Sequence, residues 1–472
     1  MLKLFTSYKE NLDYMDKRLR VSENFDIINR HLLIGESDEM TMYYVDGLIK
    51  DETMQRVMQY FLSVKNMCGE EKSPAKAFAA KHVPYVEVEM SDNFDYLVLC
   101  VMRGSVVMFG SSFGAEAIVI DARTYPARNT EEPENDKVMQ GAKDGFVETL
   151  IFNTALIRRR IRDTSLTMMY KSVSSLSKTD VVICYMQGKA NQKYVEYLSK
   201  KIDSLPAKSI TLGYESLAES LIKTRWYNPF PKIRTVERPD AAAAELMEGR
   251  VLIICDTSPR VMVLPTTIFD FMQETNDFYF PPLTGCYLRV VRHFVFWLSL
   301  FLTPLWYLLI EYQHLLPEGL KFIVPTSQSA IPIIIQLFVV EFAIDGLKIA
   351  SMNTPNMLSN SLSVIGGLIL GEAAVTIGWF TNEVIFYMAI VAIASFTQHN
   401  YELGYAFKFL RMMLLALTGI FRIWGFVAGA VITFVLLLTN KTINDKRSYL
   451  YPLFPFDPKA LGRLFFRLKK RD

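Results

Sequence analysis

Charged side chains stand inside a stretch of the chain that is otherwise apolar. The segment IPIIIQLFVVEFAIDGLKI, residues 331–349, contains Glu341, Asp345 and Lys348. These fall at positions i, i+4 and i+7, which places them on one stripe of a helix. A charge that faces lipid costs at least about 2.5 kcal/mol at the bilayer centre, so the stripe must face water, protein or the headgroup zone.

This stripe is open to a structural and to a functional interpretation. It suits an interfacial amphipathic helix, or a packed helix with an internal Asp345–Lys348 pair. It also suits the polar lining of an ion path. Glu372, inside the apolar residues 362–380, is open to the same two kinds of interpretation. It is either hydrogen-bonded to a neighbouring segment or part of a functional site.

Three common catalytic and cofactor motifs are absent from the sequence. There is no GxxxxGK[ST], no GxGxxG after a strand and no HExxH. The five histidines are scattered, without metal-ligand spacing. Asp46, Asp121 and Asp256 each follow a predicted strand, where a turn or cap role is favoured over catalysis. We therefore expect no enzyme, no cofactor and no metal site.

A basic run occurs in a predicted helix of the N-terminal part and wraps around it instead of lining one face. The run comprises Arg158, Arg159, Arg160 and Arg162. Pairing with acids of the same domain, such as Asp163 or Glu237, or a contact between subunits is favoured over nucleic acid. Neither the net charge of +2 nor any interleaved aromatic platform supports a nucleic-acid partner.

The composition changes near residues 280–292. Charges occur every few residues before this point, and long stretches after it carry almost none. A bilayer core needs about 20 apolar residues of helix. The candidate spans are residues 293–310, 331–349, 362–380, 384–397 and 409–438. The last is too long for one straight span, and Arg422 divides it.

Small residues and basic residues add detail to the membrane prediction. Two GxxxG pairs, Gly367 with Gly371 and Gly425 with Gly429, allow close helix packing within the chain or between subunits. The last fourteen residues contain six basic ones, which argues for a cytoplasmic C-terminus. The N-terminus lacks the apolar core of a signal peptide, so the N-terminal part is expected to be cytoplasmic too. An even number of spans, four or six, follows.

Strand and helix patterns alternate in the N-terminal part, for example in TMYYVDG, TDVVICYM and RVLIICD, which predicts α/β architecture. We expect two soluble α/β subdomains followed by an α-helical transmembrane bundle of four to six helices. The predicted boundaries are 1–145 and 146–285 for the subdomains, 286–440 for the transmembrane domain, and 441–472 for a basic cytoplasmic tail.

Several long motifs resemble the GerA-type spore germination A subunits. They are GFVETLIFNTALIRRRIRD, WYNPFPKIRTVERPDAAAAELMEGRVLIICDTSP and FYFPPLTGCYLRVVRH. The resemblance runs from about residue 20 to the C-terminal tail. One departure is Thr257 in CDTSP, where many A subunits have glycine; a threonine disfavours a turn with positive φ.

The resemblance implies a multi-pass protein of the spore or forespore inner membrane, with homo-oligomers and other spore membrane proteins as partners. It also implies ligand-gated ion conduction. Acidic side chains from several copies around an axis would attract cations, so an oligomeric cation channel that promotes ion release is our leading hypothesis. A non-conducting scaffold, whose polar groups satisfy one another in a tight bundle, is the first alternative. Transport of a small anion such as dipicolinate, with Arg422 as the strongest cationic candidate, is the second.

Overall fold

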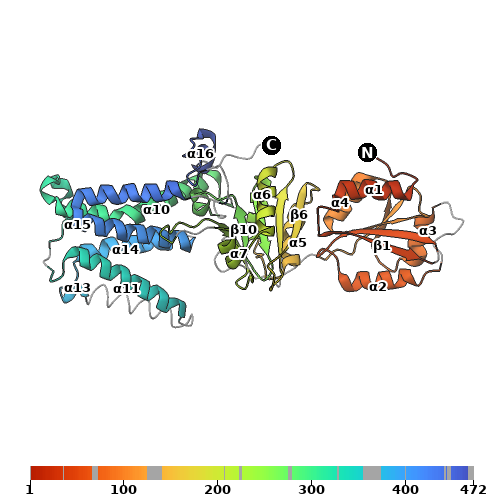
Figure 1. Cartoon of the computed structure of the whole chain (residues 1–472), viewed down its shortest axis with the longest axis horizontal. Coiled ribbons are helices and arrows are strands. Elements are labelled where there is room, and N and C mark those ends of the chain that lie inside the picture. Colours follow the sequence, from red (N-terminus) through yellow and green to blue (C-terminus); the bar gives the residue numbers. More distant parts are fainter. Residues whose placement is uncertain are drawn as a thin grey trace. The chain divides into compact units, whose positions relative to one another are not determined.

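The computed structural model describes residues 2–35, 37–65, 73–124, 141–206, 208–222, 226–274, 279–326, 329–353, 374–398, 400–440, 443 and 448–465. They divide into two compact units. The first comprises Met1–Lys223, Ile233–Thr266 and Ile443–Asp445, and the second comprises Thr224–Lys232, Thr267–Thr442 and Lys446–Asp472. The first unit contains two β-sheets covered by helices, and the second is helical (Figure 1).

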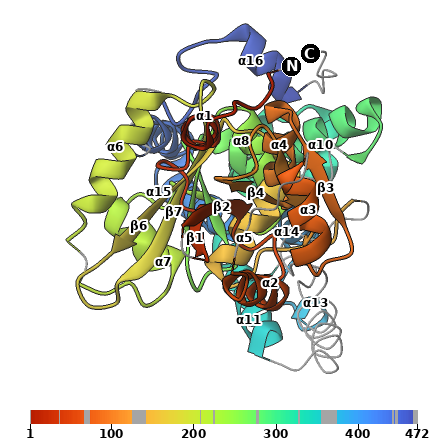
Figure 2. The same ribbon diagram turned by 90° about the vertical axis from the view of Figure 1, so that its right-hand side faces the viewer.

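The first sheet has the strand order β1-β2-β4-β5-β3, and all neighbouring strands are antiparallel. Its strands are β1 (Ile27–Ile34), β2 (Asp38–Val45), β3 (Val88–Ser91), β4 (Val106–Gly110) and β5 (Ala117–Ile120). Its helices are α1 (Tyr8–Leu19), α2 (Asp51–Leu62), α3 (Pro74–His82) and α4 (Phe94–Arg103). Tyr43 and Val107 pack with α1 and α4, whereas Met42 and Met108 pack with α2 and α3. This alternation covers both faces of the sheet with helices (Figure 2).

The second sheet has the order β6-β7-β9-β10-β8, again with antiparallel neighbours. Its strands are β6 (Leu166–Val173), β7 (Thr179–Met186), β8 (Arg234–Val236), β9 (Val251–Cys255) and β10 (Val261–Leu264). Its helices are α5 (Leu150–Arg160), α6 (Gln192–Asp203), α7 (Tyr214–Leu221) and α8 (Pro239–Met247). Val182 and Leu252 pack with α5 and α8, and Ile183 and Ile253 pack with α6 and α7.

The two halves of the first unit therefore have the same topology. Each begins with a helix and a hairpin, continues through two helices, a strand and a fourth helix, and ends with two strands. The strand order is identical once the second half is renumbered from one. The first and last helices cover one face in both halves, and the middle two cover the other.

The turn after β9 differs from the expectation drawn from its sequence. Thr257 has a φ of 62°, in the left-handed region that threonine normally avoids. Two hydrogen bonds hold it there: its N–H donates to the Glu148 carbonyl at 2.7 Å, and its hydroxyl donates to the Asp256 carbonyl at 2.6 Å. The sequence rule was outweighed by these local contacts.

The second unit has helices at four of the candidate spans, and one short helix lies in the described part of the fifth, residues 374–380. Its elements are η1 (Ile268–Met272), α10 (Pro282–Glu311), η2 (Gln313–Leu315), η3 (Glu318–Ile323), α11 (Ile333–Asn353), α13 (Ala374–Thr376), α14 (Asn382–Phe396), α15 (Tyr401–Thr439) and α16 (Pro458–Phe465). Among the described residues, α10 and α15 are long and apolar enough to cross a membrane, and α14 is a shorter apolar helix. Most of the candidate span 362–380, with Gly367, Gly371 and Glu372, lies outside the described residues.

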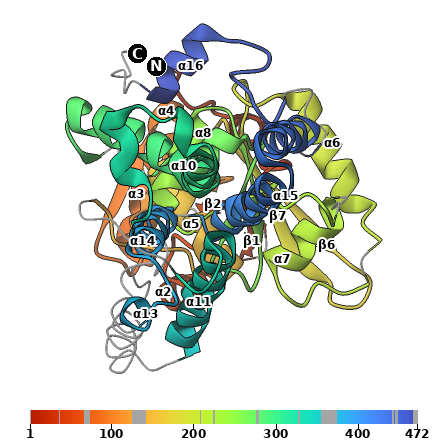
Figure 3. The same ribbon diagram turned by 90° about the vertical axis from the view of Figure 1, so that its left-hand side faces the viewer.

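Helix α15 is a hairpin, broken at Arg422, where φ is 54° and ψ is −129°. A Cβ added to Gly425 would lie 1.8 Å from the carbonyl oxygen of Leu417, and one added to Gly429 would lie 2.4 Å from Leu414 Cδ1. The segment after Arg422 thus runs back along the segment before it (Figures 1 and 3). The close approach requires both glycines.

Candidate functional site

The elements that carry the charged stripe are fixed by hydrogen bonds at their N-termini. The buried Gln336 in α11 accepts from the N–H of Thr381 at 3.0 Å and donates to the carbonyl of Ile331 at 2.7 Å. Thr381 is the N-cap of α14, so the starts of α11 and α14 are joined. Asn400 caps α15 by accepting from the N–H of Leu403 at 2.8 Å.

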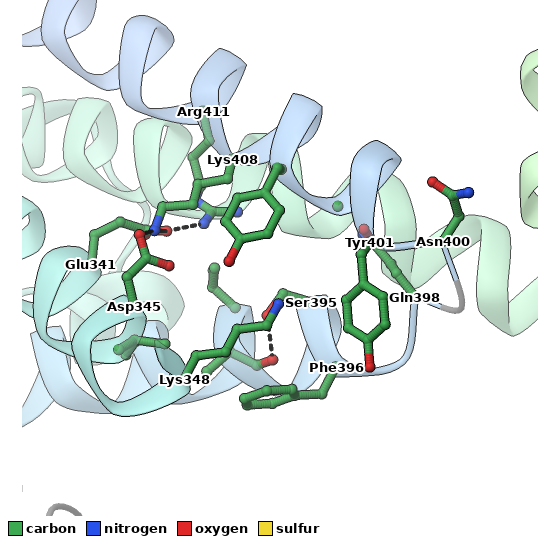
Figure 4. A pocket seen from close by; sticks show the side chains of 15 residues that line it. Glu341, Asp345, Lys348, Ser395, Phe396, Gln398, Asn400, Tyr401, Lys408 and Arg411 are labelled. Atoms are coloured by element: carbon green, nitrogen blue, oxygen red, sulfur yellow. Dashed lines mark hydrogen bonds and ion pairs between the residues drawn. The ribbon is translucent and has the colours of Figure 1, made fainter. Parts of the chain in front are cut away.

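The stripe of α11 pairs with two basic side chains of α15. Arg411 Nη2 lies 2.5 Å from Glu341 Oε1, and Lys408 Nζ lies 3.5 Å from the same oxygen. Lys408 also pairs with Asp345 (Figure 4). Glu341 and Arg411 are only 6% and 4% exposed, so their charges depend on one another for solvation.

Helix α10 takes part through the backbone of Ser299. Arg411 Nη1 donates to the Ser299 carbonyl at 2.7 Å, and Gln398 Nε2 lies 3.3 Å from the Ser299 hydroxyl. One guanidinium therefore joins α10, α11 and α15, using the fork of donors that arginine provides.

A pocket of about 40 Å³ lies beside the ion pairs. It is lined by Glu341, Ile344, Asp345, Lys348, Val391, Ala392, Ser395, Phe396, Gln398, Asn400, Tyr401, Gly404, Tyr405, Lys408 and Arg411. The Lys348 ammonium lies 4.9 Å and 4.7 Å from the ring centres of Tyr401 and Tyr405. This volume admits two or three water molecules.

The three stripe residues thus line one pocket together, but Asp345 pairs with Lys408 where the sequence suggested Lys348. Lys408 and Arg411 were missed as site residues because both were placed at the boundary before the last span, which was predicted to begin at residue 409. Helix α15 begins eight residues earlier, at Tyr401. The capping residue Asn400 was the available signal for that start.

The other membrane candidates lie elsewhere. Gly425 and Gly429 lie in the packed hairpin of α15. Arg422 stands at the hairpin turn, where its Nε lies 3.7 Å from Glu311 and its side chain is 66% exposed. It does not line the pocket.

The basic run of α5 is engaged within the first unit. Arg158 is fully buried and holds both oxygens of Asp26 at 2.8 Å. Arg160 holds both oxygens of Asp144 at 2.7 and 2.6 Å, and Arg162 Nε donates to the carbonyl of Arg159 at 3.3 Å.

The acids that Arg158 and Arg160 hold, Asp26 and Asp144, are other ones than the two examples that the sequence suggested. Asp163 accepts from the N–H of Ser165 at 2.8 Å, and Glu237 accepts from Arg260 at 2.7 Å. The hydrogen bonds from Ser165 lower the pKa of Asp163.

The three strand-end aspartates do not form a common site. Asp256 accepts from the N–H of Leu150 at 3.0 Å and so caps α5. Burial acts to raise the pKa of Asp121, but its pairing with Arg123 holds that pKa below its usual value. Burial raises the pKa of Asp46. Among the described residues, no group of three or more histidine, cysteine or acidic side chains is placed to hold a metal ion.

Comparisons with known proteins agree on one family. Residues 13–472 match the family described as Bacillus/Clostridium GerA spore germination protein. Stage V sporulation protein AF of Bacillus subtilis (strain 168) is 35% identical, over 99% of this chain and 94% of that protein. Spore germination protein KA of the same strain is 25% identical, over 96% of this chain and 83% of that protein.

A solved structure is also similar to part of the chain. It is the N-terminal domain of the A subunit of the Bacillus megaterium spore germinant receptor GerK3. The two share 24% sequence identity, with a TM-score of 0.40, and the match covers 56% of this chain and 96% of that one.

Proposed function

The chain belongs to the GerA family of spore germination proteins, and we propose that it acts in germination as a membrane-embedded, oligomeric ion-channel subunit of the spore inner membrane. The apolar helices α10 and α15 support the membrane placement. The ion-pair cluster between α11 and α15 carries the proposal, because ionisable groups inside apolar helices are costly and usually functional.

The cluster acts as a gate in this proposal. Glu341 and Asp345 are neutralised by Lys408 and Arg411 of the same chain, so neither carboxylate is available to a passing cation. This arrangement corresponds to a closed channel. Movement of α15 away from α11 exposes the two carboxylates, and several subunits around an axis then present them as acidic rings.

The channel is tested by ion flux from liposomes that contain the purified full-length protein and potassium salt. We expect Lys408→Met to raise potassium efflux, because it leaves Asp345 unpaired and weakens the closed arrangement. Breaking a buried pair on one side costs about 3–5 kcal/mol, so the increase is expected to be about tenfold or more. Asp345→Asn is expected to lower efflux through the channel opened by Lys408→Met.

Lys321→Met is the matched control, since Lys321 lies in η3 and its side chain is 61% exposed, 3.7 Å from Glu318. It is expected to leave efflux at the level of the unaltered protein. Equal efflux from all variants, with normal insertion and oligomeric state, would contradict the gate. A protein that stays monomeric in detergent would contradict the channel itself.

A non-conducting scaffold or signalling subunit is the second candidate. The observation in its favour is that Glu341, Asp345, Lys408 and Arg411 satisfy one another within a single chain. In that case the cluster joins helices, and its loss lowers stability without affecting ion flux. The same set of variants separates the two functions.

A further inference from the structure

The pocket beside the ion pairs carries an uneven charge. Its lining includes three cationic side chains, Lys348, Lys408 and Arg411, and two carboxylates, Glu341 and Asp345. The described lining residues therefore sum to a net charge of +1. A net charge among apolar helices is costly unless an opposite charge lies nearby.

Lys348 is the cation without a carboxylate partner among the described residues. Glu341 and Asp345 form their ion pairs with Lys408 and Arg411, and Asp345 acts on Lys348 only through its charge, without an ion pair. The ammonium of Lys348 lies over the rings of Tyr401 and Tyr405, 4.9 Å and 4.7 Å from their centres. Ring faces attract a cation but do not neutralise it.

Two buried polar atoms of the lining also lack partners within the described part of the chain. They are Arg411 Nε and Gln398 Oε1. The first is an N–H donor on a side chain only 4% exposed. The second is an acceptor, which suits water in the pocket, so Arg411 Nε is the atom that bears on a negatively charged ligand. A buried donor on a charged group favours an acceptor that carries negative charge.

The size of the pocket limits the ligand. Sites for drug-sized molecules measure about 300–1,000 Å³, whereas this pocket measures about 40 Å³. It has room for a single small ion and excludes an amino acid or a sugar.

We propose that the pocket binds one small monovalent anion of halide size as the counter-ion of Lys348. The proposal rests on the proposed function for one point, that the bound anion stabilises the closed arrangement of α11 and α15. Binding itself does not require conduction, so the two are tested separately.

The test measures thermal unfolding of the purified full-length protein in detergent. Sodium bromide is titrated against sodium gluconate at constant ionic strength, because gluconate is too large for the pocket. We expect bromide to raise the unfolding temperature along a saturable curve, as for any ligand that binds the native state. Lys348→Met is expected to weaken bromide binding, so that the half-maximal bromide concentration rises about tenfold or more. This is the effect of losing one hydrogen bond to a charged group.

Lys321→Met serves as the control and is expected to retain the bromide response. Lys348→Arg, which keeps the charge, guards against a general loss of folding in Lys348→Met and is expected to respond to bromide. Equal unfolding temperatures in bromide and gluconate would overturn the proposal. So would a bromide response that Lys348→Met leaves unchanged, since the ion would then bind elsewhere. A bromide response without potassium flux would support the anion site while contradicting the channel.

Discussion

Two buried arginines tie distant parts of the chain together. Arg158 joins α5 to Asp26, and its Nη1 donates to the carbonyl of Leu166 at 3.1 Å. Arg411 joins three helices of the second unit. In both cases a planar guanidinium satisfies a carboxylate and a backbone carbonyl at once, which an ammonium group does less well.

Replacement of Arg158 by methionine is expected to destabilise the first unit by about 3–5 kcal/mol, because Asp26 remains buried without its partner. The measurement is the unfolding temperature of the full-length protein. Arg162→Met, on the exposed side of the same run, is the control and is expected to change stability little. Adding Asp26→Leu to Arg158→Met is expected to recover part of the loss, and a double variant no better than the single one would contradict this account.

The sequence predicted the membership of the charged stripe but not its partners. The spacing of Glu341, Asp345 and Lys348 places them on one face of any helix, so their common pocket was predictable. The pairs with Lys408 and Arg411 join residues more than 60 positions apart. These residues come together only because α11 packs against α15, and the spacing of residues within either helix does not predict that packing.

The two segments of the α15 hairpin pack closely against each other at Gly425 and Gly429. The segments approach so closely that Gly425 has the backbone of Leu417 where a side chain would begin. By contrast, Gly346 in α11 has no atom within 4 Å of an added Cβ. The two glycines therefore differ in what they contribute, although both lie in helices of one unit.

Gly425→Ala is expected to lower stability by about 1–3 kcal/mol through overpacking against the α15 backbone. Gly346→Ala is expected to leave stability unchanged or raise it by about 0.5–1 kcal/mol, because alanine is the better helix former. Unfolding temperatures of the two purified variants provide the comparison. A similar shift in both would mean that the hairpin does not depend on close packing at Gly425.

Element types in the N-terminal part followed from the sequence, but strand directions did not. Alternating strands and helices predicted α/β architecture, and both sheets are covered by helices. The strand pairs described here are all antiparallel. Hydrophobic periodicity reports which face of a strand is buried, and not which neighbour it joins. Asp46 and Asp121 follow β2 and β5, which run in the same direction on either side of β4, whereas Asp256 follows β9 of the other sheet, so the three do not share one edge.

At the scale of the whole molecule, composition predicted a division of the chain near residues 280–292, whereas the second compact unit includes Thr267–Thr442. Charges become rare near residues 280–292, and α10 begins at Pro282. Composition did not show that part of the C-terminal region packs with the helices. Tyr449 and Leu464 are buried in the same core as Phe296 and Phe407. These contacts arise because the chain folds back onto the helices after α15, and amino-acid composition does not predict where a chain folds back.

We propose that the basic C-terminal end lies on the cytoplasmic side of the membrane and that the N-terminal end lies on the same side, as an even number of crossings requires. Epitope tags at the two ends, tested by protease digestion of sealed vesicles, check this topology. Inside-out vesicles are expected to lose both tags and right-side-out vesicles to keep both; detergent-opened vesicles serve as the digestion control. Loss of only one tag would require an odd number of crossings.

The repeated topology of the first unit changes how an assembly of this protein is counted. Each chain carries two modules of one architecture, in the same order of strands and helices. A ring of n chains therefore contains 2n related modules, so the number of similar modules around the ring is twice the number of chains. One module of each chain can change its surface while the other module retains the original one.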